Sequence, residues 1–315
     1  MIRTILVLLF LLCFFIISIP LYLIEAIIGH FDIHKKERSS FVIVTTALKI
    51  IIWLSGIHLI VKGQEKVPKD QAVLYVSNHR SYFDIVTLYP LTNNTTGFVA
   101  KKELERIPFI RRWMRYMNCQ FLDRENIKEG LKTILNCITT VKGGCSVCIF
   151  PEGTRTPGDD MLEFKEGSFK IAEKSGCLII PVAITNTENV FENHIPFIKA
   201  STVVIEFGDP IDLKAMPKEE RRHIGSQVQG IIGGMLLGII FINIAAAKGK
   251  TAVLKKPGDI PAEMSRGYVA DTSRHASMGR ETFMPSTIET ISLHLAIILG
   301  VCGAAYGLLG LLAKT

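Results

Sequence analysis

In Val76–Asp84, VSNHRSYFD, a histidine and an aspartate lie five positions apart between two apolar runs. The apolar and β-branched residues 71–77 predict a strand, and the apolar run Phe83–Leu91 predicts a helix. His79 therefore follows the carboxyl end of a strand, where open α/β sheets usually bind ligands. Asp84 lies in the first turn of the predicted helix, a position that also suits a purely structural carboxylate.

Composition indicates a basic protein held at a membrane. The 315 residues are 48% hydrophobic and carry a formal net charge of +7, with a mean hydropathy of +0.32 and a pI near 9.0. Anionic lipid headgroups would attract such a chain. Zinc-finger spacing, an aromatic RNA-binding strand and a dense Lys/Arg stripe are all missing from the sequence, so nucleic acid is not an expected partner.

The seven cysteines lack the spacing of a disulfide framework and indicate a reducing compartment. Cys145 and Cys148 form the one close pair, within a run that predicts a strand. Residues three apart on a strand point to opposite faces, so the two sulfurs cannot share a metal ion. We therefore expect buried structural thiols and no metal site.

Residues 1–62 are expected to anchor the protein in the membrane. Ile5–Ile24 is uncharged over 20 residues, long enough to cross a bilayer as a helix. Phe41–Val61 is interrupted by a lysine and a histidine, and either a spanning or an interfacial helix fits it. The basic residues 34–38 between them predict a loop on the cytoplasmic side, together with the domain that follows.

Residues 63–229 predict a globular α/β domain with a mixed, largely parallel sheet flanked by helices. The strands are expected near 71–77, 96–100, 118–122, 146–150, 178–184 and 202–207, with amphipathic helices over 103–117, 126–141 and 165–175. Residues 230–315 differ in composition. Gly230–Ala247 and Ile291–Leu312 are glycine-rich apolar runs that predict two membrane helices joined by a polar linker.

A second strand-end turn, Ile149–Thr156 (IFPEGTRT), carries Glu152, Gly153 and Arg155. Glycine permits a tight turn or a close approach to a ligand, and the planar guanidinium of arginine suits a phosphate. Taken alone, this stretch is more typical of a surface turn with a solvated Glu–Arg pair. Two such turns at two strand ends favour a functional site.

Two further cations follow other predicted strands. Lys101 ends the strand near 96–100, and Arg124 lies in CQFLDRENI, after the strand near 118–122. With Arg155 they could form a cationic pocket for a phosphorylated substrate.

In this order, NHRSYFD, FLDR, FPEGTR and IIPVAI resemble the four sequence blocks of the glycerolipid acyltransferase family, and most closely its bacterial 1-acyl-sn-glycerol-3-phosphate acyltransferases. The resemblance covers about residues 40–230. The sequence keeps the family pattern at His79, Asp84, Glu152, Gly153 and Arg155.

The resemblance implies transfer of a fatty acyl group from acyl-CoA or acyl carrier protein to the sn-2 hydroxyl of lysophosphatidic acid, giving phosphatidic acid. His79 would be the general base and Asp84 would orient it. Glu152 and backbone N–H groups near Gly153 would complete the catalytic site, the latter by stabilising the oxyanion. Arg155, Lys101 and Arg124 would hold the acceptor phosphate, and no cofactor besides the thioester donor is implied.

Two alternatives remain open at this level. A sibling acyltransferase could use glycerol-3-phosphate or another lysophospholipid, and a catalytically silent membrane or transporter-associated protein could keep the domain as a scaffold. The tail after residue 230 is similar to part of a sodium/glutamate symporter-type membrane protein. In each case the expected location is the cell membrane, with the α/β domain in the cytoplasm.

Overall fold

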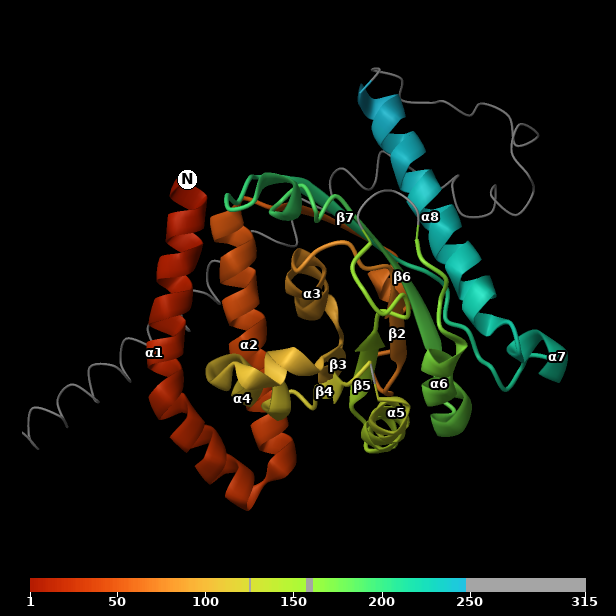
Figure 1. The fold of residues 1–315 in the computed structure, drawn as a ribbon, viewed down its shortest axis with the longest axis horizontal. Helices are drawn as coiled ribbons and strands as arrows, with labels where there is room; N and C mark the ends of the chain where they lie inside the picture. Colours follow the sequence, from red (N-terminus) through yellow and green to blue (C-terminus); the bar gives the residue numbers. More distant parts are fainter. Residues whose placement is uncertain (125, 157–160, 248–315) are drawn as a thin grey trace, which may run out of the picture.

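The computed structural model describes residues 1–124, 126–156 and 161–247, and its centre is a sheet of seven strands (Figure 1). The strands are β1 (His58–Lys62), β2 (Leu74–Ser77), β3 (Thr96–Lys101), β4 (Gln120–Leu122), β5 (Ser146–Ile149), β6 (Ile179–Thr185) and β7 (Thr202–Phe207). Their spatial order is β1-β7-β6-β2-β5-β3-β4. The strands from β6 to β4 in this order run parallel, whereas β7 is antiparallel to β6 and parallel to β1. The carboxyl ends of five strands therefore meet at one edge.

Helices cover both faces of the sheet (Figure 1). They are α1 (Ile2–Phe31), α2 (Ile33–Ser55), α3 (Phe83–Leu88), α4 (Pro108–Tyr116), α5 (Ile127–Lys142), α6 (Lys170–Ser175), α7 (Lys218–Arg221) and α8 (Ile224–Ala247). Short 3₁₀ segments are η1 (Gln64–Lys66), η2 (Tyr89–Leu91), η3 (Lys102–Arg106), η4 (Glu166–Phe169) and η5 (Glu192–His194).

The core has two layers, one on each face of the sheet. Successive strand side chains point to opposite faces, and β2 shows this directly. Tyr75 belongs to the layer beneath α1, α2, α3 and α4. Leu74 and Val76 belong to the layer beneath α5, α6 and α8. All three side chains are fully buried, so β2 lies at the centre of the fold.

All six predicted strands are present, but β1 was missed. The sequence reading assigned residues 58–61 to the second apolar segment and placed the domain boundary after residue 62. In the structure Gly56 adopts a left-handed conformation (φ 68°) and ends α2, and the chain turns to pair β1 with β7. The error has a physical cause: β1 is only five residues long and is separated from an apolar helix by only two residues, so it is too short to show a periodicity of its own.

The N-terminal helices form a hairpin (Figure 1). Both are long and apolar enough to cross a membrane by length and composition. The expected basic loop at residues 34–38 is wrong, because these residues form the first turns of α2. The Asp32 side chain caps that helix by accepting from the backbone N–H groups of His34 and Lys35, at 3.0 and 3.1 Å.

The boundary expected at residues 229/230 falls inside α8. This helix begins at Ile224, and Val228, Ile232 and Ile239 are buried in the core layer it shares with α5 and α6. The first apolar run of the tail, Gly230–Ala247, therefore continues a helix that packs on the sheet. The second run and the linker lie outside the described residues.

We predict that Glu206→Gln stabilises the protein at alkaline pH. Glu206 lies on β7 opposite Lys62 of β1, and its Oε2 is buried without a hydrogen-bond partner. Burial raises the pKa of this carboxyl, and the charges of Lys62 and Lys66 lower it in part. Because the folded state then binds the proton more tightly than the unfolded state, the free energy of unfolding falls as the pH rises from the ordinary carboxyl pKa through the raised one.

Thermal unfolding of the detergent-solubilised protein should show a gain of about 1 kcal/mol for Glu206→Gln at about pH 8, and little gain near pH 4. Glu219→Gln, which changes an exposed carboxylate of α7, is the matched control. An equal gain at both pH values would show that the effect does not come from ionisation of the buried Glu206 carboxyl.

Candidate active site

Two polar turns lie side by side at the carboxyl edge of the sheet. β2 and β5 are parallel neighbours, with Val76 paired to Ile149, so the turns that follow them begin at the same level. A backbone hydrogen bond joins the turns directly: the N–H of Thr156 donates to the carbonyl oxygen of His79 at 2.9 Å. The structure thus brings together the two stretches that the sequence singled out.

His79 and Asp84 are hydrogen-bonded. The Nδ1 atom of His79 lies 2.8 Å from Oδ2 of Asp84. The Asp84 side chain is fully buried, and that of His79 is 14% exposed. Since a carboxylate oxygen accepts, the proton of a neutral imidazole is on Nδ1, and Nε2 is left as an acceptor. Among the described residues, no protein group is hydrogen-bonded to Nε2 of His79.

Asp84 is surrounded by donors. Its Oδ2 also accepts from the backbone N–H groups of Arg80 (2.7 Å) and Ser81 (2.8 Å). Its Oδ1 accepts from the hydroxyl of Thr187 at 2.5 Å. Every one of these contacts comes from a donor, which is the environment that a buried carboxylate needs in order to stay ionised. Asp84 therefore holds the His79 turn and the His79 ring at the same time.

The His79 ring is fixed from a second direction. It stacks on the ring of Phe150, with centroids 4.2 Å apart and planes 18° from parallel. The preceding residue, Asn78, is fully buried and bridges to β6: its Nδ2 donates to the carbonyl of Ile184, and its Oδ1 accepts from the N–H of the same residue, each at 2.9 Å. The end of β2 is thus tied to β5 and to β6.

Glu152 links the two turns. Its Oε1 accepts from the backbone N–H of His79 at 2.7 Å. Its Oε2 accepts from the hydroxyl of Thr156 (2.5 Å) and from the backbone N–H of Leu162 (3.0 Å). The side chain is 4% exposed. With both oxygens engaged by the protein, Glu152 has the bonding of a positioning residue, although the sequence predicted it among the catalytic groups.

Gly153 has a backbone conformation that favours glycine, with φ +76°. A Cβ atom there would lie 2.8 Å from Nζ of Lys165. Its N–H donates to the carbonyl of Phe150 at 3.0 Å. The N–H of Gly153 itself is therefore occupied, and its structural contribution is the turn.

Arg155 reaches across to the His79 turn. Its guanidinium lies over the Tyr82 ring, 3.7 Å from the centroid, and donates to the Tyr82 hydroxyl at 3.0 Å. The same group lies 3.4 Å from Oε1 of Glu192. At 37% exposure the Arg155 side chain still faces solvent, so it remains available to an anionic ligand beside His79.

Lys101 and Arg124 lie at the same edge of the sheet but further from His79. β3 and β4 are the second and third strands from β2, which corresponds to about 10 and 14 Å at the usual strand spacing. The amine of Lys101 is 2.8 Å from Glu103 and half exposed. Their hydrogen bond lowers the pKa of Glu103. Arg124 is exposed. The two residues extend the cationic edge without touching the His79 turn.

The loop after β6 completes the site, and sequence reasoning missed it. Thr187 bonds Asp84, as described above. Glu192 in η5 accepts from the Ser81 hydroxyl (2.6 Å) and from the Tyr82 N–H (2.8 Å). The available signal was the polar run TNTEN, which follows the apolar strand at 179–185 in the same way that NHRSY follows β2.

Cys145 and Cys148 are both buried free thiols. Burial raises the pKa of Cys148 well above that of an ordinary thiol, and the nearby Cys119 and Asp84 add to the effect. In the part of the chain that the structure describes, no group of three or more His, Cys, Asp and Glu side chains is placed to hold a metal ion.

Comparisons with known proteins identify the family of this chain. Residues 58–185 match the family model described as Acyltransferase. The 1-acyl-sn-glycerol-3-phosphate acyltransferase of Borreliella burgdorferi is 34% identical over 193 residues, which are 61% of this chain and 77% of that protein. The chain belongs to the acyltransferase family. The enzyme of the same description from Haemophilus influenzae is 32% identical to this acyltransferase over 170 residues, 52% of this chain and 70% of that one.

The acyltransferase also resembles a solved structure, the 1-acyl-sn-glycerophosphate (LPA) acyltransferase PlsC from Thermotoga maritima. The TM-score is 0.62 at 27% sequence identity, over 75% of this chain and 97% of that one. The predicted family and the predicted fold class, a mixed and largely parallel sheet flanked by helices, are confirmed. Family membership argues against the alternative of a silent scaffold.

We predict that Glu152→Ala destabilises the acyltransferase by about 1–3 kcal/mol, because the partly buried N–H groups of His79 and Leu162 lose their acceptor. Glu152→Gln should cost less, since its carbonyl oxygen can still accept from His79. Denaturant unfolding measures both changes. Glu163→Ala, at an exposed glutamate in the same segment, is the control. Full stability of Glu152→Ala combined with lost activity would instead identify Glu152 as a group that acts on the substrate.

Proposed function

We propose that this acyltransferase moves a fatty acyl group from acyl-CoA or acyl carrier protein to the sn-2 hydroxyl of 1-acyl-glycerol-3-phosphate, with His79 as the general base. The observation that carries the proposal is the buried Asp84 carboxylate on Nδ1 of His79. It leaves Nε2 basic and stabilises the imidazolium that would form. The names of the relatives support the choice of acceptor.

The reaction would proceed without a covalent acyl-enzyme, because the thioester is already activated. Nε2 of His79 takes the proton of the acceptor hydroxyl as that oxygen attacks the thioester carbonyl carbon. The tetrahedral intermediate then collapses, the carbon–sulfur bond breaks, and the imidazolium returns the proton to the departing thiolate. The products are phosphatidic acid and a free thiol. Asp84 would keep the ring in the required tautomer throughout.

Arg155 is the best-placed cation for the acceptor phosphate. It contacts the His79 turn through Tyr82 and Glu192, so a phosphate on its guanidinium would lie close to the base. A guanidinium binds phosphate through paired, charge-assisted hydrogen bonds. Lys101 and Arg124, further along the edge, would add longer-range attraction for the anionic substrates.

The N-terminal hairpin would place the site at one leaflet of the cell membrane. The middle of α1 is bonded to α4: the Trp113 indole donates to the Ser18 hydroxyl at 2.8 Å, and the Tyr22 hydroxyl donates to the carbonyl of Phe109 at 2.9 Å. If α1 crossed the bilayer fully, the arginines of α4 would enter the hydrocarbon, at a high cost. We therefore propose that the hairpin inserts its apolar outer face into the cytoplasmic leaflet, where long-chain acceptors reside.

We predict that His79→Ala lowers the turnover number by at least about a hundredfold, because the attacking hydroxyl loses its base. Asp84→Asn should lower the turnover number by a similar factor. One carboxylate oxygen is replaced by an NH₂ group, which would face the donors that now bond Asp84. Thiol release from acyl-CoA, with lysophosphatidic acid in detergent, measures both. His58→Ala, at an exposed histidine on β1, is the matched control.

The same assay separates the possible substrates. Release with glycerol-3-phosphate but not lysophosphatidic acid would identify the sibling reaction, and release only from acyl carrier protein thioester would define the donor. Full activity of His79→Ala would refute the general-base role.

We predict that Arg155→Gln raises the KM for lysophosphatidic acid about tenfold or more, with a smaller effect on the KM for the donor. Arg155→Lys should recover part of this loss, because a single amine keeps the charge and loses the paired geometry. Steady-state kinetics with each substrate varied measures the difference. Arg222→Gln, on the loop after α7, serves as the control for a lost surface charge. A fall in the turnover number with an unchanged acceptor KM would contradict phosphate binding.

A further inference from the structure

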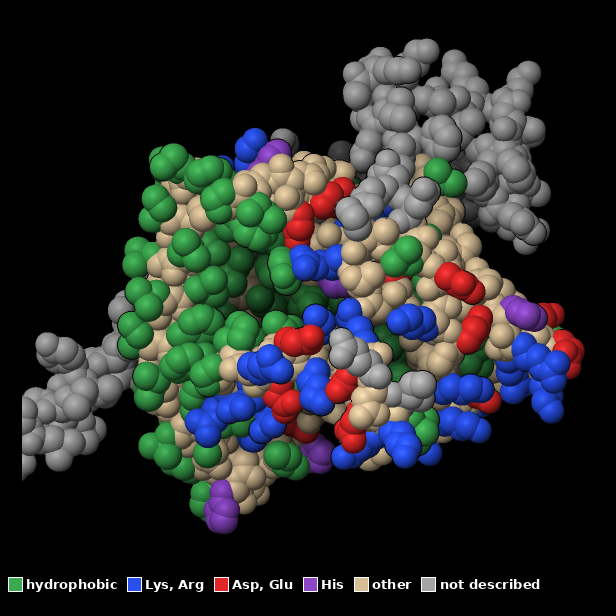
Figure 2. Space-filling model, in the orientation of Figure 1, with side chains coloured by type: hydrophobic (Ala, Val, Ile, Leu, Met, Phe, Trp, Pro, Cys, Tyr) green, Lys and Arg blue, Asp and Glu red, His purple; other side chains and the backbone are tan. Residues whose placement is uncertain are grey.

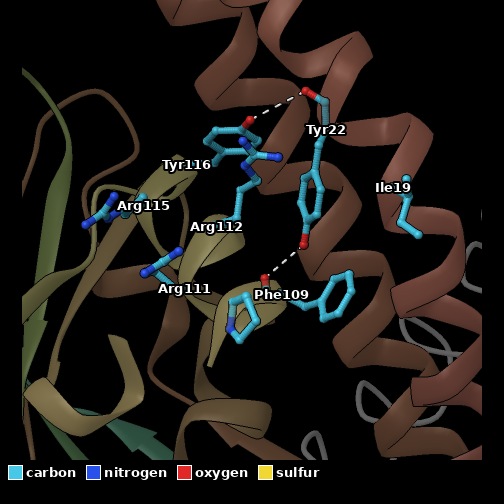
Figure 3. Close-up of a pocket in the computed structure, with 8 residues that line it drawn as sticks. Ile19, Tyr22, Phe109, Arg111, Arg112, Arg115 and Tyr116 are labelled. Carbon is cyan, nitrogen blue, oxygen red and sulfur yellow. Dashed lines mark hydrogen bonds between the residues drawn. The ribbon is translucent and has the colours of Figure 1, made fainter. Parts of the chain in front are cut away.

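A cavity lies away from the strand-end turns, between α1 and α4 (Figure 3). Its volume is about 580 Å³. Three arginines of α4 line it, Arg111, Arg112 and Arg115, and Ile19 and Tyr22 of α1 contribute to the other wall. Neither His79 nor Arg155 is among the lining residues, so the cavity is distinct from the candidate active site.

The cavity carries more positive charge than the protein neutralises. Arg115 is paired with Glu105, at 2.6 Å. Arg112 lies with its guanidinium carbon 5.0 Å from the centre of the Tyr22 ring. Arg111 is half-buried, and within the described part of the chain its side chain has no hydrogen bond or ion pair with a protein group. Guanidinium groups in this situation bind phosphate oxygens readily.

The walls of the cavity are held in place before any ligand binds. The Tyr22 hydroxyl donates to the carbonyl of Phe109, and the Tyr116 hydroxyl lies 3.5 Å from the carbonyl of Tyr22 (Figure 3). Trp113, on the buried side of α4, packs against Tyr22 with ring centroids 5.3 Å apart. A ligand would therefore find preformed walls and lose less free energy to ordering.

The cavity also adjoins the apolar face of α1. Ile19 lines it and is 59% exposed, and Leu12, Ile16 and Leu23 on the same helix are exposed as well. Figure 2 shows hydrophobic side chains covering this side of the molecule, with Lys and Arg side chains gathered next to them. A ligand that suits both surfaces has an anionic head and an apolar tail.

We propose that this cavity binds the headgroup of an anionic membrane phospholipid that is not a substrate. Its phosphate would lie on Arg111 and Arg112, and its acyl chains would follow the exposed face of α1. The proposal rests on the leaflet placement proposed above and not on the acyl-transfer chemistry. Such a lipid would fix the depth and tilt of the enzyme at the membrane surface.

Trp113 offers a direct readout. The sequence contains two tryptophans, Trp53 and Trp113, and Trp53 is 69% exposed on α2. Trp53→Phe leaves Trp113 as the single tryptophan, which can be excited selectively over the tyrosines. We expect dihexanoyl phosphatidylglycerol, added to this protein in non-ionic detergent, to change the fluorescence saturably. In the same Trp53→Phe background, the double substitution Arg111→Gln/Arg112→Gln should weaken the binding of this lipid about tenfold or more.

The matched control is Lys170→Gln/Arg222→Gln, which removes two exposed charges remote from α4 and should leave the affinity unchanged. An equal response to dihexanoyl phosphatidylcholine, or an unchanged affinity in the Arg111/Arg112 variant, would overturn the proposal. Saturation by inorganic phosphate at the same concentration would identify a free-anion site instead, and tighter binding of coenzyme A would assign the cavity to the acyl donor. Because fluorescence reports binding without turnover, failure of the acyl-transfer proposal would not affect this result.

Discussion

A fully buried negative charge is the constraint on which the site depends. Moving a carboxylate out of water costs several kcal/mol unless donors replace the lost water. Asp84 receives donors from three directions: the His79 ring, the backbone of its own turn, and Thr187 after β6. The turn cannot relax without leaving this charge unpaired. The same bonds that stabilise the charge therefore set the orientation of the histidine.

Two further carboxylates repeat this arrangement around the same turn. Glu152 comes from the turn after β5 and accepts from the His79 N–H. Glu192 comes from the loop after β6 and accepts from Ser81 and Tyr82. The chain segments after three strands are thus joined by acidic side chains. The carboxylate oxygens of these side chains accept hydrogen bonds from N–H and hydroxyl groups of the His79 turn. Arg155, in contact with Glu192, adds a partly exposed cation beside these carboxylates.

The N-terminal hairpin packs on the same sheet that carries this frame. α1 and α2 are apolar, and they pack on α4 and on the sheet layer that carries Tyr75. Their attachment through Ser18 and Tyr22 makes the hairpin part of the same core rather than a separate anchor. Insertion of the hairpin into a leaflet, as proposed above, would therefore fix the position of the whole fold relative to the bilayer. The arginines of α4 lie where the apolar surface meets the polar one.

The spacing of side chains along the chain predicted the strands and singled out the two polar turns. Apolar runs that end in polar residues predicted β2 to β7, and the residue types at His79, Asp84, Glu152 and Arg155 indicated a base, its partner and a phosphate ligand. These features are local, because they depend on side-chain spacing along a few residues.

Which turns meet, and which groups each side chain bonds, depends on the order of the strands in the folded sheet. β1 was missed because its place in the sheet depends on β7, more than a hundred residues later. Thr187 and Glu192 enter the site because β6 lies beside β2, a neighbour relation that strand periodicity does not encode. Glu152 bonds the His79 N–H for the same reason, since hydrogen bonds between distant segments arise only when the sheet order aligns their ends.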